Sequence, residues 1–485
     1  MWKRLRRLFG GRRSQPTGTA PVAKNAPAIQ SKSEPPNDLA ISSDATAADA
    51  RDNAQEVPTV PPKSAAGVST PAIDLVLGVD FGTSCSKVVI GDPSWQNTSL
   101  AVSFAREDGD ISAWLDTTRF GSEANLKMRL MSDPTSEHVR NLVACYLAKV
   151  ITYSRSWFDL NRPAEYGRRG IRWSLNLGFP DKSVKGSRLA AAYQEVANIA
   201  VAVASQPEPP SPELVGSIRR GALETERIVP PSRVQLYPEI AAQLAGYINS
   251  PYRRKGNLLL IDVGAGTLDV STIILHGDQE QDIVSFHFCE VQELGVLRLY
   301  DKRVRALEAI SPGSTKYTLE YFQDGSRPVP ESFREMVHAA APALERAFCR
   351  VTGEFAEDIL GVVLRCLIRF RRSQREVHSN RGFEPWGRNL RFFLTGGGCR
   401  SRFYKAQLVE GPLEDRLAGN FTRWHPDRSR RLSAREGLLL ERFPLPPNLI
   451  NFPKALQTDF DRLSVAYGLA FGGENLMKVT AATHK

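Results

Sequence analysis

The sequence has few cysteines and histidines, and neither residue type is spaced as metal ligands are. The six cysteines contain no Cys-x-x-Cys pair and the seven histidines form no His-Glu-x-x-His motif. Neither a zinc site nor a disulfide framework is therefore indicated. Long hydrophobic runs are also missing, because the most apolar stretches contain Asp or Arg. We predict no membrane-spanning helix and expect a cytoplasmic protein.

Aromatic residues are absent from residues 14–72, which contain nine prolines and much Ala and Ser. A segment of this composition cannot bury enough apolar surface to offset the entropy that is lost on ordering. We predict that residues 14–72 are a disordered linker and that the folded part begins near Ile73.

Acidic residues are absent from residues 1–13, which carry six of the basic side chains behind the net charge of +10. Trp2, Leu5, Leu8 and Phe9 lie at helical spacing against this cationic face, as in a short helix that rests on an anionic membrane. A solvated, disordered start is the alternative. No nucleic-acid-binding module follows the basic residues, so we expect no nucleic-acid partner.

From residue 73 onward, stretches with strand periodicity alternate with stretches of helical periodicity. This alternation predicts an α/β architecture. A hydrophobic content of 42% with 24% charged residues fits a soluble globular protein with a sizeable core. Residues 331–351 are among the segments that we predict as a continuous helix.

One internal repeat points to chemistry. The stretches "LVLGVDFGTSCSKVVI" and "LLLIDVGAGTLDVSTI" each place an Asp at the end of an apolar strand, then a Gly, a turn of small residues and a second strand. The acids are Asp80 and Asp262. Glycine lets a backbone approach a phosphate, and a nearby carboxylate can hold the water shell of Mg²⁺. Each hairpin alone reads as an ordinary tight turn, but the duplication favours two similar lobes around one magnesium-bound polyphosphate.

A third stretch, "LRFFLTGGGCRSRF", ends a strand at a triple-glycine turn, Gly396–Gly398, and opens a helix. Such a turn lets a purine lie against the backbone, and Arg400 can stack its guanidinium on the base. A plain strand-to-helix connection is the alternative for this stretch taken by itself.

In this order, the three stretches resemble the phosphate 1, phosphate 2 and adenosine motifs of the actin, sugar kinase and heat-shock ATPase superfamily. The run "IDVGAGTLDVS" is most similar to seventy-kilodalton heat-shock (DnaK-like) chaperones. "YPEIAAQLAGYI", "ELGVLRLYDKRV" and "DFDRLSVAYGLAFG" resemble further helices of that ATPase domain. The resemblance implies a two-lobed actin-like α/β ATPase fold over residues 73–478, with duplicated ribonuclease H-like lobes and a central nucleotide cleft.

The resemblance also implies ATP or ADP with Mg²⁺ as cofactors. Asp80 and Asp262 would coordinate the hydrated metal and orient the attacking water, and Lys127 and Glu239 match the positions of two further catalytic groups. The implied nucleotide contacts are Gly82, Thr83 and Ser84 for the β-phosphate, Gly264, Gly266 and Thr267 for the γ-phosphate, and Gly396, Gly397 and Arg400 for the adenosine.

Two departures from the family pattern affect the catalytic assignments. Pro238 and Glu239 stand in the reverse of the chaperones' Glu-Pro order, which displaces the carboxylate by one residue. Lys127 stands at a slightly shifted spacing, so a solvated surface lysine is an alternative. Weak hydrolysis, or nucleotide binding without turnover, is consistent with both departures.

The main functional hypothesis is a slowly hydrolysing, chaperone-like switch that acts on an unidentified partner protein, without a peptide-binding domain. The alternative is a membrane-associated, filament-forming actin homologue, because bacterial proteins of that kind have a similar basic start. A small-molecule kinase is a third class, and a catalytically inert scaffold a fourth.

Overall fold

The structure is a computed structural model that describes most of residues 71–481. The gaps are at 94–97, 106–110, 113–114, 117–118, 121–122, 168, 181–186, 222–232, 277–282, 319–329, 379–389, 414, 418–437, 454–458 and 472–478. The basic segment at 1–13 and nearly all of the predicted linker at 14–72 lie outside the described residues.

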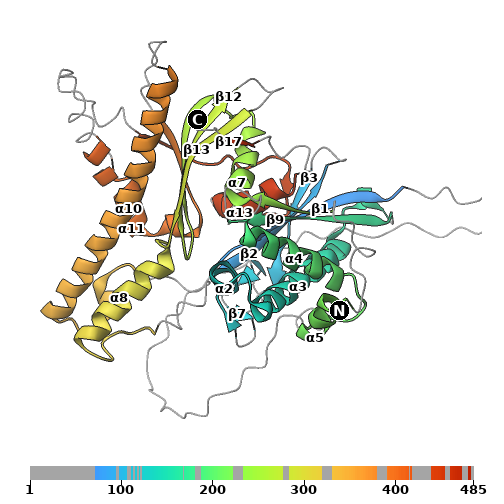
Figure 1. Cartoon of the computed structure of the whole chain (residues 1–485), viewed down its shortest axis with the longest axis horizontal. Helices are drawn as coiled ribbons and strands as arrows, with labels where there is room; N and C mark the ends of the chain where they lie inside the picture. Colours follow the sequence, from blue (N-terminus) through green and yellow to red (C-terminus); the bar gives the residue numbers. More distant parts are fainter. Residues whose placement is uncertain are drawn as a thin grey trace, which may run out of the picture. The chain divides into compact units, whose positions relative to one another are not determined.

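The first sheet contains the first of the two repeated hairpins (Figure 1). Its strand order is β10-β9-β1-β2-β3-β16, in which β1, β2 and β3 are antiparallel neighbours while β9 and β10 run parallel to β1. The bounds of these strands are β1 Ile73–Phe81, β2 Cys85–Asp92, β3 Thr98–Ala101, β9 Ile171–Phe179, β10 Val234–Pro238 and β16 Leu449–Ile450. Short strands precede β9, namely β4 Phe104–Ala105, β5 Ile111–Ser112, β6 Leu115–Asp116, β7 Arg119–Phe120 and β8 Glu123–Ala124.

The second sheet repeats this plan. Its order is β15-β14-β11-β12-β13-β17, with β11, β12 and β13 antiparallel and β14 and β15 parallel to β11. Its strands are β11 Gly256–Val263, β12 Leu268–His276, β13 Ile283–Gln292, β14 Leu390–Thr395, β15 Leu438–Glu441 and β17 Val479–Ala481. The duplicated strand order confirms the predicted two-lobed actin-like α/β fold.

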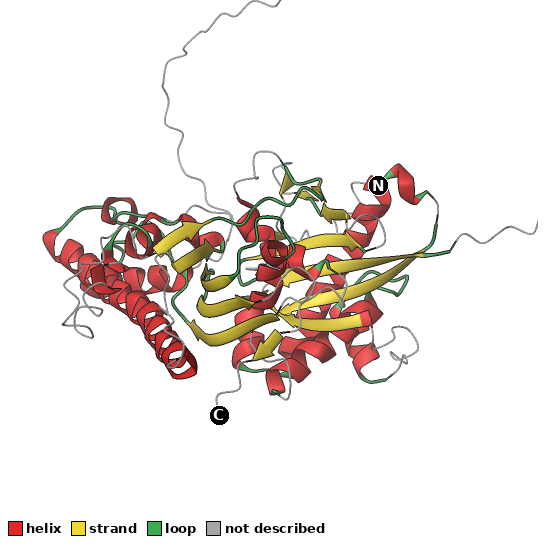
Figure 2. Cartoon of the chain, turned by 90° about the horizontal axis from the view of Figure 1, so that it is seen from above, coloured by secondary structure: helices red, strands yellow, loops and turns green. Residues whose placement is uncertain are grey.

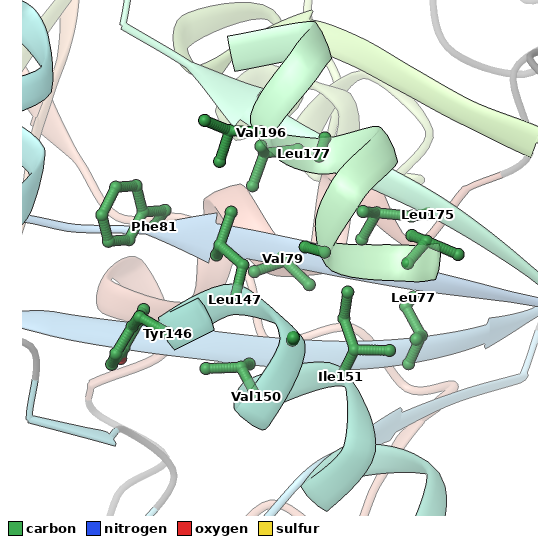
Figure 3. Packing of buried hydrophobic residues seen from close by; sticks show 14 of the residues in the cluster. Leu77, Val79, Phe81, Tyr146, Leu147, Val150, Ile151, Leu175, Leu177 and Val196 are labelled. Atoms are coloured by element: carbon green, nitrogen blue, oxygen red, sulfur yellow. The ribbon is translucent and has the colours of Figure 1, made fainter. Parts of the chain in front are cut away.

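Helices α3 and α4 cover one face of the first sheet (Figure 3). The inward residues of β1, Leu77, Val79 and Phe81, are almost fully buried against Leu147 and Val196 of these helices. Ser136 and Ser187 are the N-cap residues directly before these helices, and their hydroxyls accept hydrogen bonds from backbone N–H groups in the first turn. The helices of this lobe are α2 Leu126–Ser132, α3 Glu137–Asn161, η1 Ala164–Tyr166, α4 Arg188–Val203 and α5 Pro212–Arg219.

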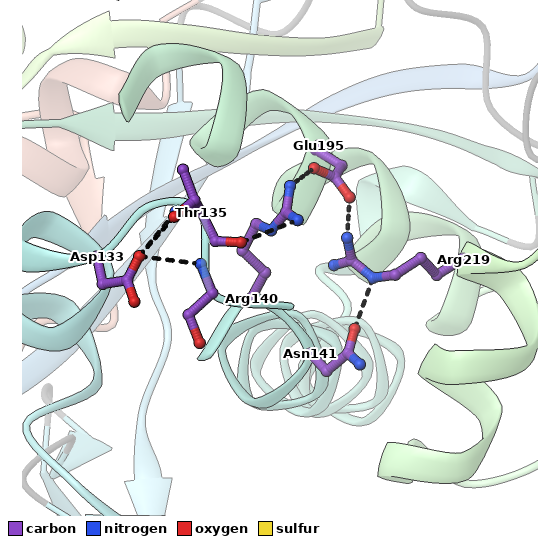
Figure 4. A network of polar contacts seen from close by, with 7 residues as sticks. Asp133, Thr135, Arg140, Asn141, Glu195 and Arg219 are labelled. Atoms are coloured by element: carbon purple, nitrogen blue, oxygen red, sulfur yellow. Dashed lines mark hydrogen bonds and ion pairs between the residues drawn. The ribbon is translucent and has the colours of Figure 1, made fainter. Parts of the chain in front are cut away.

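A polar network joins α3, α4 and α5 to one another (Figure 4). Glu195 of α4 forms ion pairs with Arg140 of α3 and Arg219 of α5. Arg219 Nε also donates to Asn141 Oδ1 at 2.6 Å. One carboxylate therefore fixes three helices to one another, which is a structural role.

The second lobe has its core between its sheet and helices α8 and α10, and Figures 1 and 2 show α10 running past the strands. One sequence prediction is wrong here, because residues 331–351 do not form one helix. Helix α9 ends at Met336, and Pro342 opens α10. Proline disfavours helical backbone in the residue before it, so the helix restarts at Pro342. The helices are α8 Val296–Ile310, α9 Phe333–Met336, α10 Pro342–His378, η4 Gly397–Arg400 and α11 Arg402–Leu408.

Two further helices, α7 Glu239–Ile248 and α13 Phe460–Leu469, pack against each other, and α13 also packs on β1 and β2. Their backbones approach closely at one glycine. A Cβ atom added to Gly468 would lie 1.8 Å from the carbonyl oxygen of Ala242. The crossing therefore depends on a residue without a side chain at position 468.

We expect Gly468→Ala to lower the free energy of unfolding by about 2 kcal/mol, because overpacking a close helix crossing forces the two backbones apart. Chemical denaturation of the full chain measures the change. Gly353→Ala is the matched control, because Gly353 also lies within a helix but has open space around it. That control should stabilise the protein by about 0.5–1 kcal/mol. Equal effects of the two substitutions would contradict the close-packing argument.

Candidate functional site

The first predicted phosphate turn lies between β1 and β2. The register places Asp80 directly opposite Lys87, and Lys87 Nζ donates to Asp80 Oδ2 at 2.7 Å. A Cβ atom on Gly82 would lie 2.4 Å from the carbonyl oxygen of Cys85, so this position admits only glycine without a shift of the turn. The sequence reasoning missed Lys87. The sequence did contain a signal for it: Lys87 is the one lysine in the apolar strand that leaves the turn, and the register of a hairpin places it opposite Asp80.

The second turn, between β11 and β12, has the same register, but the residue opposite its Asp carries a different charge. Asp262 lies opposite Asp269, so an acid stands where the first hairpin has Lys87. The backbone N–H of Gly264 donates to the carbonyl oxygen of Thr267 at 2.8 Å and closes the turn. Burial raises the pKa of Asp269 to about 8, and the negative charges of Asp262 and Glu239 add to the shift. Burial also raises the pKa of Asp262, although Gln243 and Lys87 oppose it.

The tips of the two hairpins meet. A Cβ atom on Gly266 would lie 3.5 Å from Thr83 Cγ2, 3.6 Å from Thr83 Oγ1 and 3.2 Å from Met128 Sδ. Thr83 belongs to the first turn and Gly266 to the second. The structure thus brings the predicted β-phosphate and γ-phosphate turns, from two different lobes, into contact distance of each other.

Lys127 and Glu239 form a third part of the site. Lys127 Nζ donates to Glu239 Oε1 at 2.7 Å, and the lysine is 7% exposed, so it is not the solvated surface lysine of the alternative. Glu239 is the first residue of α7, directly after Pro238. Burial opposes the charge of Lys127, but the carboxylates of Glu239 and Asp80 outweigh it and raise the pKa of the ammonium. Burial also raises the pKa of Glu239, and the charge of Lys127 and its hydrogen bond oppose that shift.

Gln243 joins this group to the second turn, and the sequence reasoning missed it. Its Nε2 donates to Asp262 Oδ2 at 2.6 Å and to Thr395 Oγ1 at 2.9 Å. The other oxygen, Asp262 Oδ1, is so close to Gly396 that a Cβ atom there would lie 2.2 Å from it. The Asp262 carboxylate is thus held between α7 and the triple-glycine turn. Nothing in the local sequence of α7 distinguishes this glutamine as a site residue.

The predicted adenosine turn connects β14 to η4 and α11. Gly396 has φ 81°, a left-handed conformation that favours glycine. Arg400, predicted to stack on a base, forms an ion pair with Asp459, the residue that precedes α13. Its side chain is 40% exposed, so one side of the guanidinium is engaged and part of it reaches solvent. This ion pair ties the adenosine turn to the beginning of α13.

The donor set fits a hydrated Mg²⁺ ion better than a metal bound directly by protein. Among the described residues, no group of three or more His, Cys, Asp or Glu side chains is arranged to hold a metal ion. Magnesium usually keeps several waters and binds through one or two carboxylates together with phosphate oxygens. Asp80 and Asp262 meet that requirement, and the raised pKa of Asp262 indicates a carboxylate that a nearby cation would stabilise.

The raised pKa values give a prediction for the apo protein. The pKa of an Asp in the unfolded chain is about 4. Between about pH 4 and about pH 8, the folded form therefore holds a proton that the unfolded form has lost. We expect the free energy of unfolding to fall as the pH rises through this range, measured by denaturant titration. Asp269→Asn should remove part of this slope. An unchanged slope in that variant would contradict the assignment to Asp269.

Comparisons with known proteins give weak likenesses. No family model matches the sequence, and no curated protein matches it either. Similar solved structures include a ParM filament from Clostridium botulinum, with 11% identity, a TM-score of 0.38, and coverage of 82% of this chain and 98% of that one. Another is MreB 5 of Spiroplasma citri bound to AMPPNP, with 12% identity, a TM-score of 0.36, and coverage of 82% and 95%.

Such scores carry no argument about function, and the fold assignment rests on the duplicated strand order. None of the comparisons supports the narrower prediction of a heat-shock (DnaK-like) ATPase or of chaperone activity. In the described part of the chain, no helix has both the length and the apolar composition needed to cross a membrane.

Proposed function

We propose that this chain binds Mg-ATP between its two phosphate turns, hydrolyses it slowly, and acts as a nucleotide-dependent switch. One observation carries the proposal. Charged side chains from both lobes gather where the two hairpin tips meet: Asp80 pairs with Lys87, and Lys127 pairs with Glu239. The charges of Lys87, Asp80 and Lys127 act on the pKa of Asp262. Opposed acids, lysines and glycine turns are what a metal-bound triphosphate requires.

Each group has a role in this proposal. The backbone N–H groups of the two glycine turns and the ammonium of Lys87 bind phosphate oxygens. Bound Mg²⁺ would supply charge neutralisation at the β- and γ-phosphates, held through water by Asp80 and Asp262. Glu239 accepts the proton of the attacking water, and Lys127 moves from Glu239 to the γ-phosphate. Positioning and charge neutralisation supply most of the rate in such a reaction.

The contacts of Asp262 give the switch a physical basis. The carboxylate is held by Gln243 of α7 on one side and abuts Gly396 of the adenosine turn on the other. Helix α7 packs on α13, which in turn packs on the first sheet. A change at the γ-phosphate is therefore passed to the helices that join the lobes. The size of the conformational response is limited by the difference between the nucleotide affinities of the two conformations of the switch.

The test is nucleotide binding by the full chain, measured by calorimetry, followed by phosphate release. Wild type should bind ATP with Mg²⁺ and much more weakly with a chelator. Asp80→Asn and Asp262→Asn should each lower the Mg-dependent affinity by at least about tenfold. Asp358→Asn, an exposed carboxylate on α10, is the control and should bind as wild type does. Wild type that ignores adenine nucleotides would overturn the proposal.

The same preparation can distinguish between the possible outputs of the switch. Sedimentation with ATP, with ADP and without nucleotide tests self-assembly into filaments. Association with a client or partner protein, without sedimentation of the chain itself, tests action on another protein. Sedimentation with anionic vesicles tests membrane contact through residues 1–13, with Arg6→Glu/Arg7→Glu as the matched variant. Nucleotide-dependent pelleting would favour the filament hypothesis over the chaperone-like one.

A further inference from the structure

Tyr193 of α4 has a buried polar group that the proposed roles do not use. The residue is 1% exposed, and its ring packs edge-on against Phe179 with ring centroids 5.3 Å apart. Its hydroxyl is buried and has no hydrogen-bond partner among the described residues. Buried hydroxyls are nearly always paired, because an unmade hydrogen bond carries the full cost of desolvation. The Tyr193 hydroxyl can therefore donate a hydrogen bond to an acceptor that comes within its reach.

The elements around Tyr193 carry or lead into both members of the Lys127–Glu239 pair. Helix α4 packs against β10, which leads directly into Glu239, and it also touches α2, which carries Lys127. Burial raises the pKa of Tyr193, and the charges of Lys127, Glu239 and Asp80 all act on the phenol. The phenol ring packs on Phe179, and the neighbouring Gly178 abuts the carboxylate, because a Cβ atom on Gly178 would lie 3.4 Å from Glu239 Oε1. Tyr193 thus lies on the α4 side of the Lys127–Glu239 pair, whose members come from α2 and α7.

We propose that Tyr193 is a positioning residue for hydrolysis, whose hydroxyl donates a hydrogen bond to the Glu239 carboxylate when Lys127 turns to the γ-phosphate. The inference rests on the proposed function. Without Lys127 beside it, Glu239 would be a buried carboxylate without its ion-pair partner, and burial would favour its protonated form. A hydroxyl donor keeps the carboxylate ionised and fixes its orientation, so that it remains able to accept a proton.

The reaction that this arrangement serves is attack of water on the γ-phosphate. The water oxygen forms a bond to the γ-phosphorus, and the bond from that phosphorus to the bridging oxygen breaks, with its electron pair leaving on ADP. One proton of the water passes to Glu239. Tyr193 transfers no proton in this scheme, so its effect is confined to the ionisation state and the orientation of the Glu239 carboxylate.

Tyr193→Phe in the full chain tests the proposal. Loss of an unpaired buried hydroxyl should leave the melting temperature of the apo protein equal or higher. We expect Mg-ATP affinity within about twofold of wild type and single-turnover hydrolysis about tenfold slower. The acid limb of the pH–rate profile should move upward by about one pH unit, because a lost donor raises the pKa of Glu239. Tyr166→Phe, at a second buried tyrosine of the same lobe, is the control.

The outcomes distinguish this inference from the proposed function. Wild type without nucleotide binding, or with binding but no hydrolysis, overturns both the ATPase mechanism and the role of Tyr193. Normal hydrolysis and an unshifted pH profile in Tyr193→Phe overturn the Tyr193 role alone, and so does a variant that fails to fold, since the hydroxyl would then be structural. In a Glu239→Gln background, Tyr193→Phe should slow hydrolysis no further, and additive losses would count against the proposal.

Discussion

Replacing Lys127 by alanine will lower the free energy of unfolding by about 3–5 kcal/mol and abolish measurable hydrolysis. The lysine is buried, and its ammonium lies 2.7 Å from Glu239 Oε1. Removing one member of a buried ion pair leaves the other charge buried without a partner, and this strongly destabilises the folded state. Denaturant titration measures the loss of stability, and phosphate release measures the loss of turnover.

A double variant separates the two effects. In Lys127→Met/Glu239→Gln both charges are gone, so most of the lost stability should return, while hydrolysis remains absent because neither group is restored. Lys302→Met is the control, since that lysine is exposed and pairs loosely with Asp358 at 3.5 Å; such a pair contributes at most about 1 kcal/mol. A stable, active Lys127→Ala protein would show that the pair is neither buried in solution nor part of the site.

The repeated hairpins could be predicted because their information is local. Each is a strand, an acid, a glycine turn and a second strand within about sixteen residues of sequence, and strand periodicity with glycine turns is readable at that range. The same holds for the triple-glycine turn. The two-lobed fold followed from the duplication, since two copies of one local unit predict two similar sheets.

The rest of the site depends on contacts between distant parts of the chain. Lys127 and Glu239 are 112 residues apart, and Gln243 reaches Thr395 across 152 residues. No local pattern marks a glutamine in an alanine-rich helix, or a tyrosine such as Tyr193, as facing a cluster of charges. Lys87 is the exception, because hairpin register alone places it opposite Asp80.

Gly396→Ala will weaken Mg-ATP binding by about a hundredfold or more. A Cβ atom there would lie 2.2 Å from Asp262 Oδ1 and 2.5 Å from the carbonyl oxygen of Val263, so either the carboxylate or the turn must move. A displaced Asp262 loses its hydrogen bond from Gln243 together with its place beside the phosphates. The left-handed backbone at φ 81° adds strain for any residue with a side chain. Calorimetric titration with Mg-ATP measures the affinity.

Gly313→Ala separates the backbone strain from the collision. Gly313 has a closely similar φ of 75°, but a Cβ atom there would meet nothing within 4 Å. That variant should lose about 1–2 kcal/mol of stability from the left-handed conformation alone and bind Mg-ATP as wild type does. If both alanine variants bind the nucleotide equally well, the position of the Asp262 carboxylate against the adenosine turn does not govern binding. If only Gly396→Ala fails to bind Mg-ATP, the contact between Asp262 and the glycine turn is what makes the two motifs one site.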